Sequence, residues 1–130
     1  MKIEAFKDYD KFTELCKEVL GITVTTIPDI IIVAKTDNGN IAAFLSGYIS
    51  YDNSFYIQYA GVLPEYQKKG LTRSYFTAML DKDITYITIV ENTHIVMMKL
   101  LLAMKFIPFG CRHSTDNNFY IEWIRRAKNG

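Results

Sequence analysis

The residues best suited to chemistry lie between Gln67 and Thr72, in a basic stretch that separates an apolar segment from a helical pattern. Lys68 and Lys69 supply positive charge, and Gly70 lets the backbone approach a bound group closely. Gln67 adds an amide and Thr72 a hydroxyl. Unpaired N–H groups at a helix start, assisted by the helix dipole, bind anions such as phosphate. The stretch therefore predicts a phosphate site, and a solvated basic turn that caps the helix is the alternative.

Two elements must position this stretch. Residues 55–62 are rich in β-branched and aromatic side chains and poor in charge, which predicts a central strand. Apolar residues then recur at helical spacing, which predicts a helix: Leu71, Tyr75, Phe76, Met79 and Leu80. No Gly-Lys-Ser/Thr or Gly-x-Gly-x-x-Gly sequence is present at this turn, which excludes a nucleotide P-loop and a dinucleotide fingerprint.

The first part of the chain predicts strands and one helix ahead of the central strand. Residues 30–35 and 41–50 flank an Asn-Gly turn, a strong hairpin signal, and a second turn at 51–54 leads into the central strand. A short strand is expected at 2–6. Asp8 or Asp10 can cap a helix that buries Tyr9, Phe12, Leu15, Cys16, Val19 and Leu20 and that ends at Gly21.

The last part of the chain predicts two further strand regions around a second core helix. Residues 84–90 alternate as a strand, and the helix before them makes it parallel to the central strand. Residues 95–105 form a nearly all-apolar helix, and residues 107–113 and 118–124 form a closing pair. The expected fold class is therefore α/β, with a mixed, mostly antiparallel sheet flanked by helices.

Composition limits the chain to one domain, residues 1–130, and to a few functional classes. The net charge of +1 gives no general attraction to nucleic acid or to an anionic membrane. The two cysteines lie far apart without metal-ligand spacing, so we expect neither zinc nor a disulfide framework. We expect a reduced, cytoplasmic setting, because no signal peptide or membrane span is evident.

Residues 62–72, Val-Leu-Pro-Glu-Tyr-Gln-Lys-Lys-Gly-Leu-Thr, resemble the acetyl-CoA-binding motif of the GNAT superfamily of N-acetyltransferases. That motif reads Gln/Arg-x-x-Gly-x-Gly/Ala after a Val-x-Pro-type strand end. The match runs through Gln67 and Gly70, whereas Thr72 replaces the usual Gly or Ala. The resemblance implies that loop amides hold the pyrophosphate of acetyl-CoA or another acyl-CoA and that the preceding strand pairs with pantetheine. It places these residues at the cofactor: Ala60, Val62, Gln67, Lys68, Lys69, Gly70, Leu71, Thr72, Arg73 and Asn92.

A second segment also resembles the family, which commonly has an Asn at the start of the later helix and a Gly-Phe at its end. Either Asn92 or His94 can hold the Asn position, and Lys105 stands in place of the glycine. The two alignments put Lys99 or Leu101 where many relatives have a catalytic tyrosine. The resemblance therefore does not identify a general acid.

Glu91 and His94 are the catalytic candidates, because they stand where a strand ends and a helix begins at the expected mouth of the cleft. The alternatives are a helix-start acid stabilised by the dipole and a capping histidine. Tyr56 occupies the position of a glutamate base in some histone-type relatives. Tyr56 and Gln58 are candidate acceptor-binding residues, although sheet packing is equally open for Gln58 and its neighbour Tyr59.

The resemblance thus implies an N-acetyltransferase that transfers an acetyl group from acetyl-CoA to a small-molecule or peptide amine, by direct attack in a ternary complex. We expect no metal, no nucleic acid and no membrane partner, and a monomer or homodimer. One alternative is a non-enzymatic acyl-CoA-binding or interaction domain with a degenerate GNAT fold. Another is an unrelated α/β domain with a phosphate-binding helix start.

Overall fold

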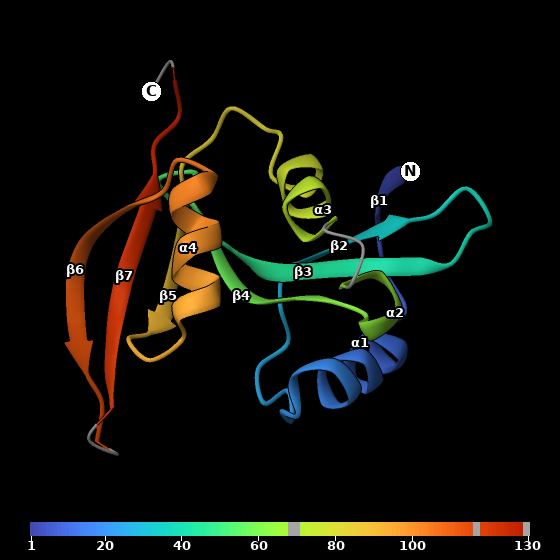
Figure 1. The fold of residues 1–130 in the computed structure, drawn as a ribbon, viewed down its shortest axis with the longest axis horizontal. Coiled ribbons are helices and arrows are strands. Elements are labelled where there is room, and N and C mark those ends of the chain that lie inside the picture. The colour runs from blue at the N-terminus through green and yellow to red at the C-terminus, as the bar shows by residue number, and fades with distance from the viewer. Residues whose placement is uncertain (68–70, 116–117, 129–130) are drawn as a thin grey trace. The chain divides into compact units, whose positions relative to one another are not determined.

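The computed structural model describes residues 1–67, 71–115 and 118–128 and is shown in Figure 1. The hydrogen-bonded strand order is β1-β2-β3-β4-β5-β7-β6. These features confirm the predicted α/β class with a mixed, mostly antiparallel sheet. None of the helices in the described part of the chain is both long and apolar enough to span a membrane. The elements are β1 (Lys2–Ala5), α1 (Tyr9–Leu15), η1 (Cys16–Leu20), β2 (Ile30–Lys35), β3 (Ile41–Ile49), β4 (Phe55–Val62), α2 (Pro64–Gln67), α3 (Thr72–Met79), β5 (Tyr86–Glu91), α4 (Ile95–Ala103), β6 (Ile107–His113) and β7 (Phe119–Arg125).

The chain forms two compact units, and each is made of two separate stretches of sequence. The first comprises Met1–Ile49 and Gln58–Asp81. The second comprises Ser50–Ile57 and Lys82–Gly130. Strand β4 is therefore shared, because its first residues belong to the second unit and its last residues to the first.

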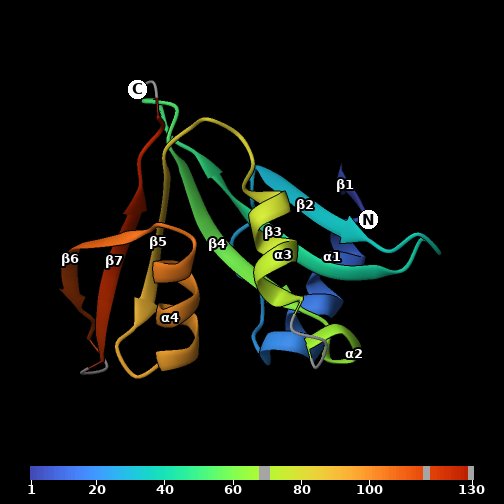
Figure 2. The same ribbon diagram turned by 45° about the horizontal axis from the view of Figure 1, so that its top comes forward.

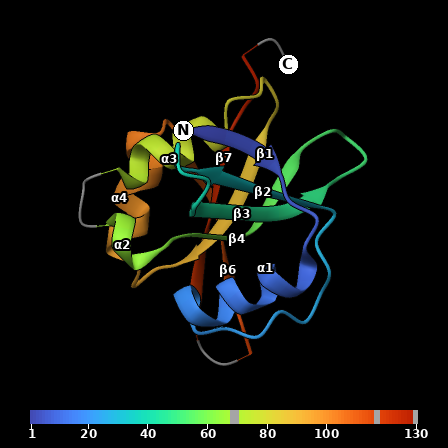
Figure 3. The same ribbon diagram turned by 90° about the vertical axis from the view of Figure 1, so that its right-hand side faces the viewer.

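The first unit has strands β1, β2 and β3 with helices on both faces. Both β1 and β3 pair with β2 in antiparallel orientation. Helix α1 and the π-helical turn η1 lie on one side of these strands and α3 on the other, as Figures 1 and 2 show. Figure 3 views the same unit from the side, with α1 below β3.

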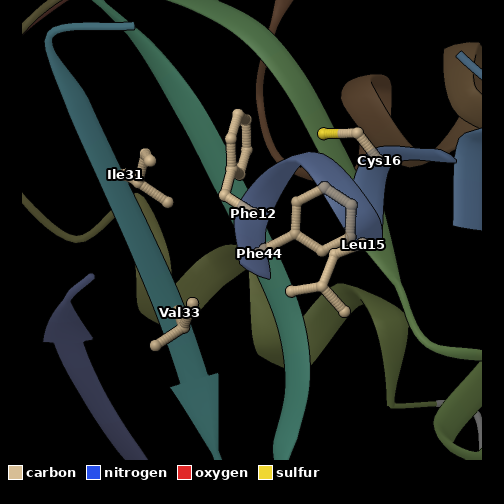
Figure 4. Close-up of a cluster of buried hydrophobic side chains, with 6 residues drawn as sticks. All are labelled: Phe12, Leu15, Cys16, Ile31, Val33 and Phe44. Carbon is tan, nitrogen blue, oxygen red and sulfur yellow. The ribbon is translucent and has the colours of Figure 1, made fainter. Parts of the chain in front are cut away.

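The core of the first unit joins α1 and η1 to two strands. Phe12, Leu15 and Cys16 come from the helical segment, and Phe12 meets Phe44 of β3 edge to face at 6.2 Å between ring centroids. Burial of these side chains removes apolar surface from water, the main stabilising term in folding. Figure 4 shows the cluster, which is Phe12, Leu15, Cys16, Ile31, Val33 and Phe44.

The ends of the first helical segment match the predicted signals, with one correction. The Asp8 carboxylate accepts the Lys11 N–H at 3.1 Å as the N-cap, and Gly21 ends the segment in the left-handed region at φ 69°. Leu20 is exposed, contrary to the prediction that it is buried. The reason is η1, in which i→i+5 bonding rotates side chains away from α-helical spacing.

The second unit consists of β5, β7 and β6 with α4 beside them (Figure 2). Tyr86 and Val90 of β5 and Trp123 of β7 are buried. At the start of β5, Phe55 and Tyr56 of β4 pair in parallel with Tyr86 and Ile87. The predicted parallel pairing is therefore confirmed.

The boundaries of three elements in this unit differ from the prediction, and β7 is shifted by one residue, to Phe119–Arg125 from the predicted 118–124. Strand β5 begins at Tyr86, later than residue 84, and α4 ends at Ala103, earlier than residue 105. Helix α4 ends early because Lys105 adopts φ 74°, which lies in the left-handed region and does not continue an α-helix.

Candidate functional site

The predicted strand and helix on either side of the basic stretch are present, and a short helix, α2, follows the strand. Leu63 N donates to Ala42 O at 2.9 Å, which holds the end of β4 against β3. Helix α2 follows as a single turn, in which Gln67 Nε2 donates to Val62 O at 2.6 Å. The Gln67 amide therefore fixes the turn that leads from the strand toward α3.

Helix α3 presents an N-terminus suited to an anion. Its N-cap, Leu71, offers no side-chain acceptor to the first N–H groups, and the first turn contains no acidic residue. Burial of Tyr75, Phe76 and Met79 anchors the helix on β2 and β3 of the same unit. The N–H groups and the dipole of this helix therefore favour negative charge at its start.

The predicted phosphate contacts fall partly on this helix start. Thr72 is half-buried and Arg73 is exposed, and both lie in the first turn of α3. Three further predicted contacts lie outside the described residues: Lys68, Lys69 and Gly70.

Strand β4 contains one residue more than the strand that it faces. At one end Leu63 N donates to Ala42 O, and at the other Ser50 N donates to Ser54 O, each at 2.9 Å. One more residue lies between Ser54 and Leu63 than between Ala42 and Ser50. Such an insertion is a β-bulge, which disrupts the ladder locally and re-aims side chains.

The side chains of β4 locate the extra residue near Gln58 and Tyr59. Tyr59 packs against the α1 core cluster, and a Cβ on Gly61 would lie 2.9 Å from the Phe44 ring, so both residues face α1. Gln58 forms a hydrogen bond with Ser46. Ser46 lies two residues from Phe44 on β3, so the two side chains share a face and Gln58 faces α1 as well. Consecutive side chains on one face break the two-residue period of a regular strand.

Gln58, predicted to bind the acceptor, is engaged by the chain itself. Its Oε1 accepts the Ser46 hydroxyl at 3.1 Å, and its Nε2 donates to Tyr48 Oη at 2.8 Å and to the Thr26 carbonyl at 3.1 Å. Tyr56, the other acceptor candidate, is 37% exposed. It belongs to the part of β4 that pairs with β5 in the second unit.

Glu91, Asn92 and His94 lie together in the second unit. Glu91 is the last residue of β5, and its carbonyl accepts His94 N at 2.9 Å. The exposed Asn92 is tied through its backbone N–H to Phe119 O at 2.9 Å. His94 caps α4, because its Nδ1 accepts Met97 N at 3.2 Å. A neutral histidine whose Nδ1 accepts has its proton on Nε2.

Cys16 is buried, and burial raises the pKa of its thiol to about 11. A thiol in this state is not a nucleophile near neutral pH, which agrees with its prediction as a core residue. Among residues 1–67, 71–115 and 118–128, no group of three or more His, Cys, Asp or Glu side chains is placed to hold a metal ion.

Sequence reasoning missed the partners of Gln58, which are Ser46, Tyr48 and the Thr26 carbonyl. Ser46 did offer a signal, because it is a hydroxyl in an otherwise apolar strand and is fully buried. A buried hydroxyl requires a hydrogen-bond partner. Its pairing with Gln58 follows from the register of β3 and β4, which the bulge changes.

Comparison with solved structures identifies the same fold in three kinds of acetyltransferase. The ribosomal-protein-S18-alanine N-acetyltransferase from Escherichia coli has a TM-score of 0.77 at 17% identity, over 99% of this chain and 97% of that one. A spermidine N-acetyltransferase from Vibrio cholerae has a TM-score of 0.78 at 13% identity, over 95% and 94%. NAA60 from Arabidopsis thaliana, in complex with acetyl-CoA, has a TM-score of 0.75 at 11% identity, over 99% of each chain.

A comparison with curated proteins finds no significant match. The family model described as the acetyltransferase (GNAT) family matches residues 4–94, which include β4, α3 and the turn between them. The resemblance inferred from residues 62–72 is thereby confirmed, and the chain belongs to the GNAT acetyltransferase family.

Proposed function

We propose that this protein transfers an acetyl group from acetyl-CoA, or a related acyl-CoA, to an amine by direct attack within a ternary complex. One observation supports the proposal most. In a chain of the GNAT family, a β4 strand with an extra residue leads into an α3 N-terminus that Leu71 leaves without a side-chain cap. We further propose that residues 1–130 act as one acetyltransferase domain.

In this proposal the pyrophosphate binds at residues 68–73 and pantetheine extends along the backbones of Ala60 and Val62. The helix N-terminus offers N–H donors and positive potential. The hydrogen bond from Gln67 Nε2 to Val62 O holds α2 against the end of β4.

The reaction joins the amine nitrogen to the thioester carbonyl carbon and breaks the carbon–sulfur bond. A β-bulge leaves backbone groups of a strand outside the ladder, so N–H groups of β4 are available to stabilise the oxyanion. The ammonium proton must leave the amine, and the thiolate must gain one. His94 accepts at Nδ1 from Met97, which leaves Nε2–H as a donor and favours Glu91 as the base.

The acceptor in this proposal is a small-molecule amine or a peptide amine. The solved relatives include enzymes named for a ribosomal-protein alanine and for spermidine, so the shared fold accommodates both kinds. The second candidate function is acyl-CoA binding without turnover. Leu101 stands at one of the two positions where many relatives have a catalytic tyrosine, and it is 3% exposed. A buried leucine has no proton to give to the thiolate, which favours binding without turnover.

Titration calorimetry with acetyl-CoA and with CoA tests the proposal, using the wild type and Gly70→Glu. We expect micromolar binding that Gly70→Glu abolishes, because the new carboxylate repels the pyrophosphate. Asn38→Glu is the matched control, since it adds the same charge at the exposed β2–β3 turn. Release of CoA thiol with added amines then separates an enzyme from a binding domain. Absence of binding to both ligands would refute the proposal.

A further inference from the structure

A polar cluster on the α1 face of the first unit is made of Ser46, Tyr48, Gln58 and the Thr26 carbonyl. Ser46 is fully buried, and Gln58 and Tyr48 are half-buried. The cluster lies where β4 contains its extra residue, at Gln58 and Tyr59. Its hydrogen bonds connect β3, β4 and the segment between η1 and β2.

The orientation of the Gln58 amide follows from its partners. A backbone carbonyl accepts and never donates, so the atom 3.1 Å from Thr26 O must be Nε2. The Ser46 hydroxyl then donates to Oε1 at 3.1 Å, and the second Nε2 hydrogen reaches Tyr48 Oη at 2.8 Å. Both hydrogens of the amide are used, so the side chain is locked in one position.

The segment that Gln58 contacts is otherwise tied down at its two ends. At the start, Ile22 N donates to Cys16 O at 3.4 Å. At the end, Asp29 N donates to Gly47 O at 3.0 Å, and Asp29 Oδ2 accepts Ile49 N at 3.2 Å. Among the hydrogen bonds of the described residues, the one from Gln58 to Thr26 alone connects the middle of this segment to the sheet.

The middle of the segment presents uncharged side chains to solvent. Thr25, Thr26 and Ile27 are exposed, and Ile27 is 69% exposed. Buried Pro28 and half-buried Val24 flank them. No charged residue occurs between Gly21 and Asp29. An amine that approaches β4 from the α1 face therefore meets hydroxyl and apolar groups here.

We infer that Gln58 is a positioning residue that clamps residues 22–29 onto β4 and so sets the acceptor side of the site for an amine with uncharged neighbouring groups. The inference rests on the proposed function, because that function puts the thioester carbonyl at β4. Gln58 acts through Thr26 and makes no contact with the reacting atoms. A peptide amine fits the uncharged residues 22–28 better than a polyamine does, because the further charges of a polyamine find no carboxylate among these residues.

Two substitutions separate the clamp from the rest of the cluster. Gln58→Glu keeps the shape, still accepts from Ser46 and can accept the Tyr48 hydroxyl, to which Gln58 donates in the wild type. It has no N–H for Thr26 O and sets a carboxylate against that carbonyl. Tyr48→Phe is the matched control, because it removes a different partner of the same amide and leaves the Thr26 bond in place.

Hydrogen–deuterium exchange of the full chain measures the clamp directly. We expect Gln58→Glu to speed exchange of the amides of residues 22–29 about tenfold, the effect of one lost hydrogen bond, with α1 unchanged. We expect Tyr48→Phe to exchange like the wild type there. Equal exchange in Gln58→Glu and wild type would overturn the inference even if acetyl-CoA binds. Because this measurement needs no ligand, it is independent of whether the proposed function is correct.

Steady-state kinetics with acetyl-CoA and trialanine amide, against spermidine, measure the consequence. We expect Gln58→Glu to raise the KM for trialanine amide about tenfold, with kcat and the KM for acetyl-CoA within about twofold. Tyr48→Phe should leave that KM near the wild-type value. An unchanged KM in Gln58→Glu, a fall in kcat alone, or a preference for spermidine would each contradict the assignment.

Discussion

Gly61→Ala tests the close contact between β4 and the α1 core. A Cβ at residue 61 would lie 2.9 Å from Phe44 Cζ and 3.1 Å from both Phe44 Cε1 and Val19 Cγ1. Phe44 is fully buried and packs edge to face on Phe12, so its ring has no space to move into. The added methyl group must therefore displace β4, the ring or η1.

The expected loss of stability follows from two opposing terms. Overpacking of a filled core costs about 1–3 kcal/mol. Replacing a glycine outside the left-handed region lowers the entropy of the unfolded chain and returns about 0.4–1 kcal/mol. The net destabilisation should be about 1–2 kcal/mol, which lowers the Tm of a chain of this size by about 3–10 °C.

Gly110→Ala provides the matched control, since its Cβ would also lie 2.9 Å from its nearest neighbour. That neighbour is Glu122 Oε1, the end of a flexible side chain on β7, so the contact relaxes and stability should change by about 0.5 kcal/mol or less. Urea unfolding of both variants measures the difference. Adding Val19→Ala to Gly61→Ala should restore part of the loss. Equal stability of the two alanine variants would refute the steric argument.

Two further predictions concern Lys105 and the cysteines. Lys105→Gly should stabilise the protein by about 0.5–1 kcal/mol, because a φ of 74° strains a residue with a side chain but not glycine. The control, Lys99→Gly inside α4, should destabilise the protein by about 1 kcal/mol. Urea unfolding measures both changes, and a change of the same sign in the two variants would contradict the reasoning. With a thiol reagent at pH 8, exposed Cys111 should react quickly and buried Cys16 only after unfolding. Because burial raises the pKa of Cys16 from its ordinary value of 9.0 to about 11, its contribution to stability should be complete below pH 9 and lost as the pH rises to 11, and Cys16→Ala should lack that decline.

Local signals in the sequence predicted most of the fold. The bounds of β2 and β4 match the prediction, and Asp8, Gly21 and the turn before residue 40 act as predicted. Each of these features depends on neighbouring residues, through side-chain period, capping or turn geometry. These features can be predicted from one sequence because the residues that determine them are close to one another in the chain.

Each feature that the sequence did not predict depends either on a one-residue shift in the register of a strand or helix, or on a tertiary contact. The extra residue in β4 and the π-helical turn η1 leave the apolar pattern almost unchanged, so periodicity does not reveal them. The Gln58 cluster joins residues 26, 46, 48 and 58, which only the folded sheet brings together. The catalytic roles of Glu91 and His94 stay predictions, since they depend on where the acceptor binds.

The division of the chain into two units, each made of two stretches, affects the order in which they are completed on the ribosome. Residues 50–57 emerge early but belong to the unit whose other stretch starts at residue 82. Phe55, which packs on Tyr86 at 5.8 Å between ring centroids, must wait for 31 further residues, or about 1.5–6 s at ~5–20 residues per second. During that interval the nascent chain exposes an aromatic strand without its parallel partner. A chaperone that binds extended apolar segments would therefore find its target here before translation reaches β5.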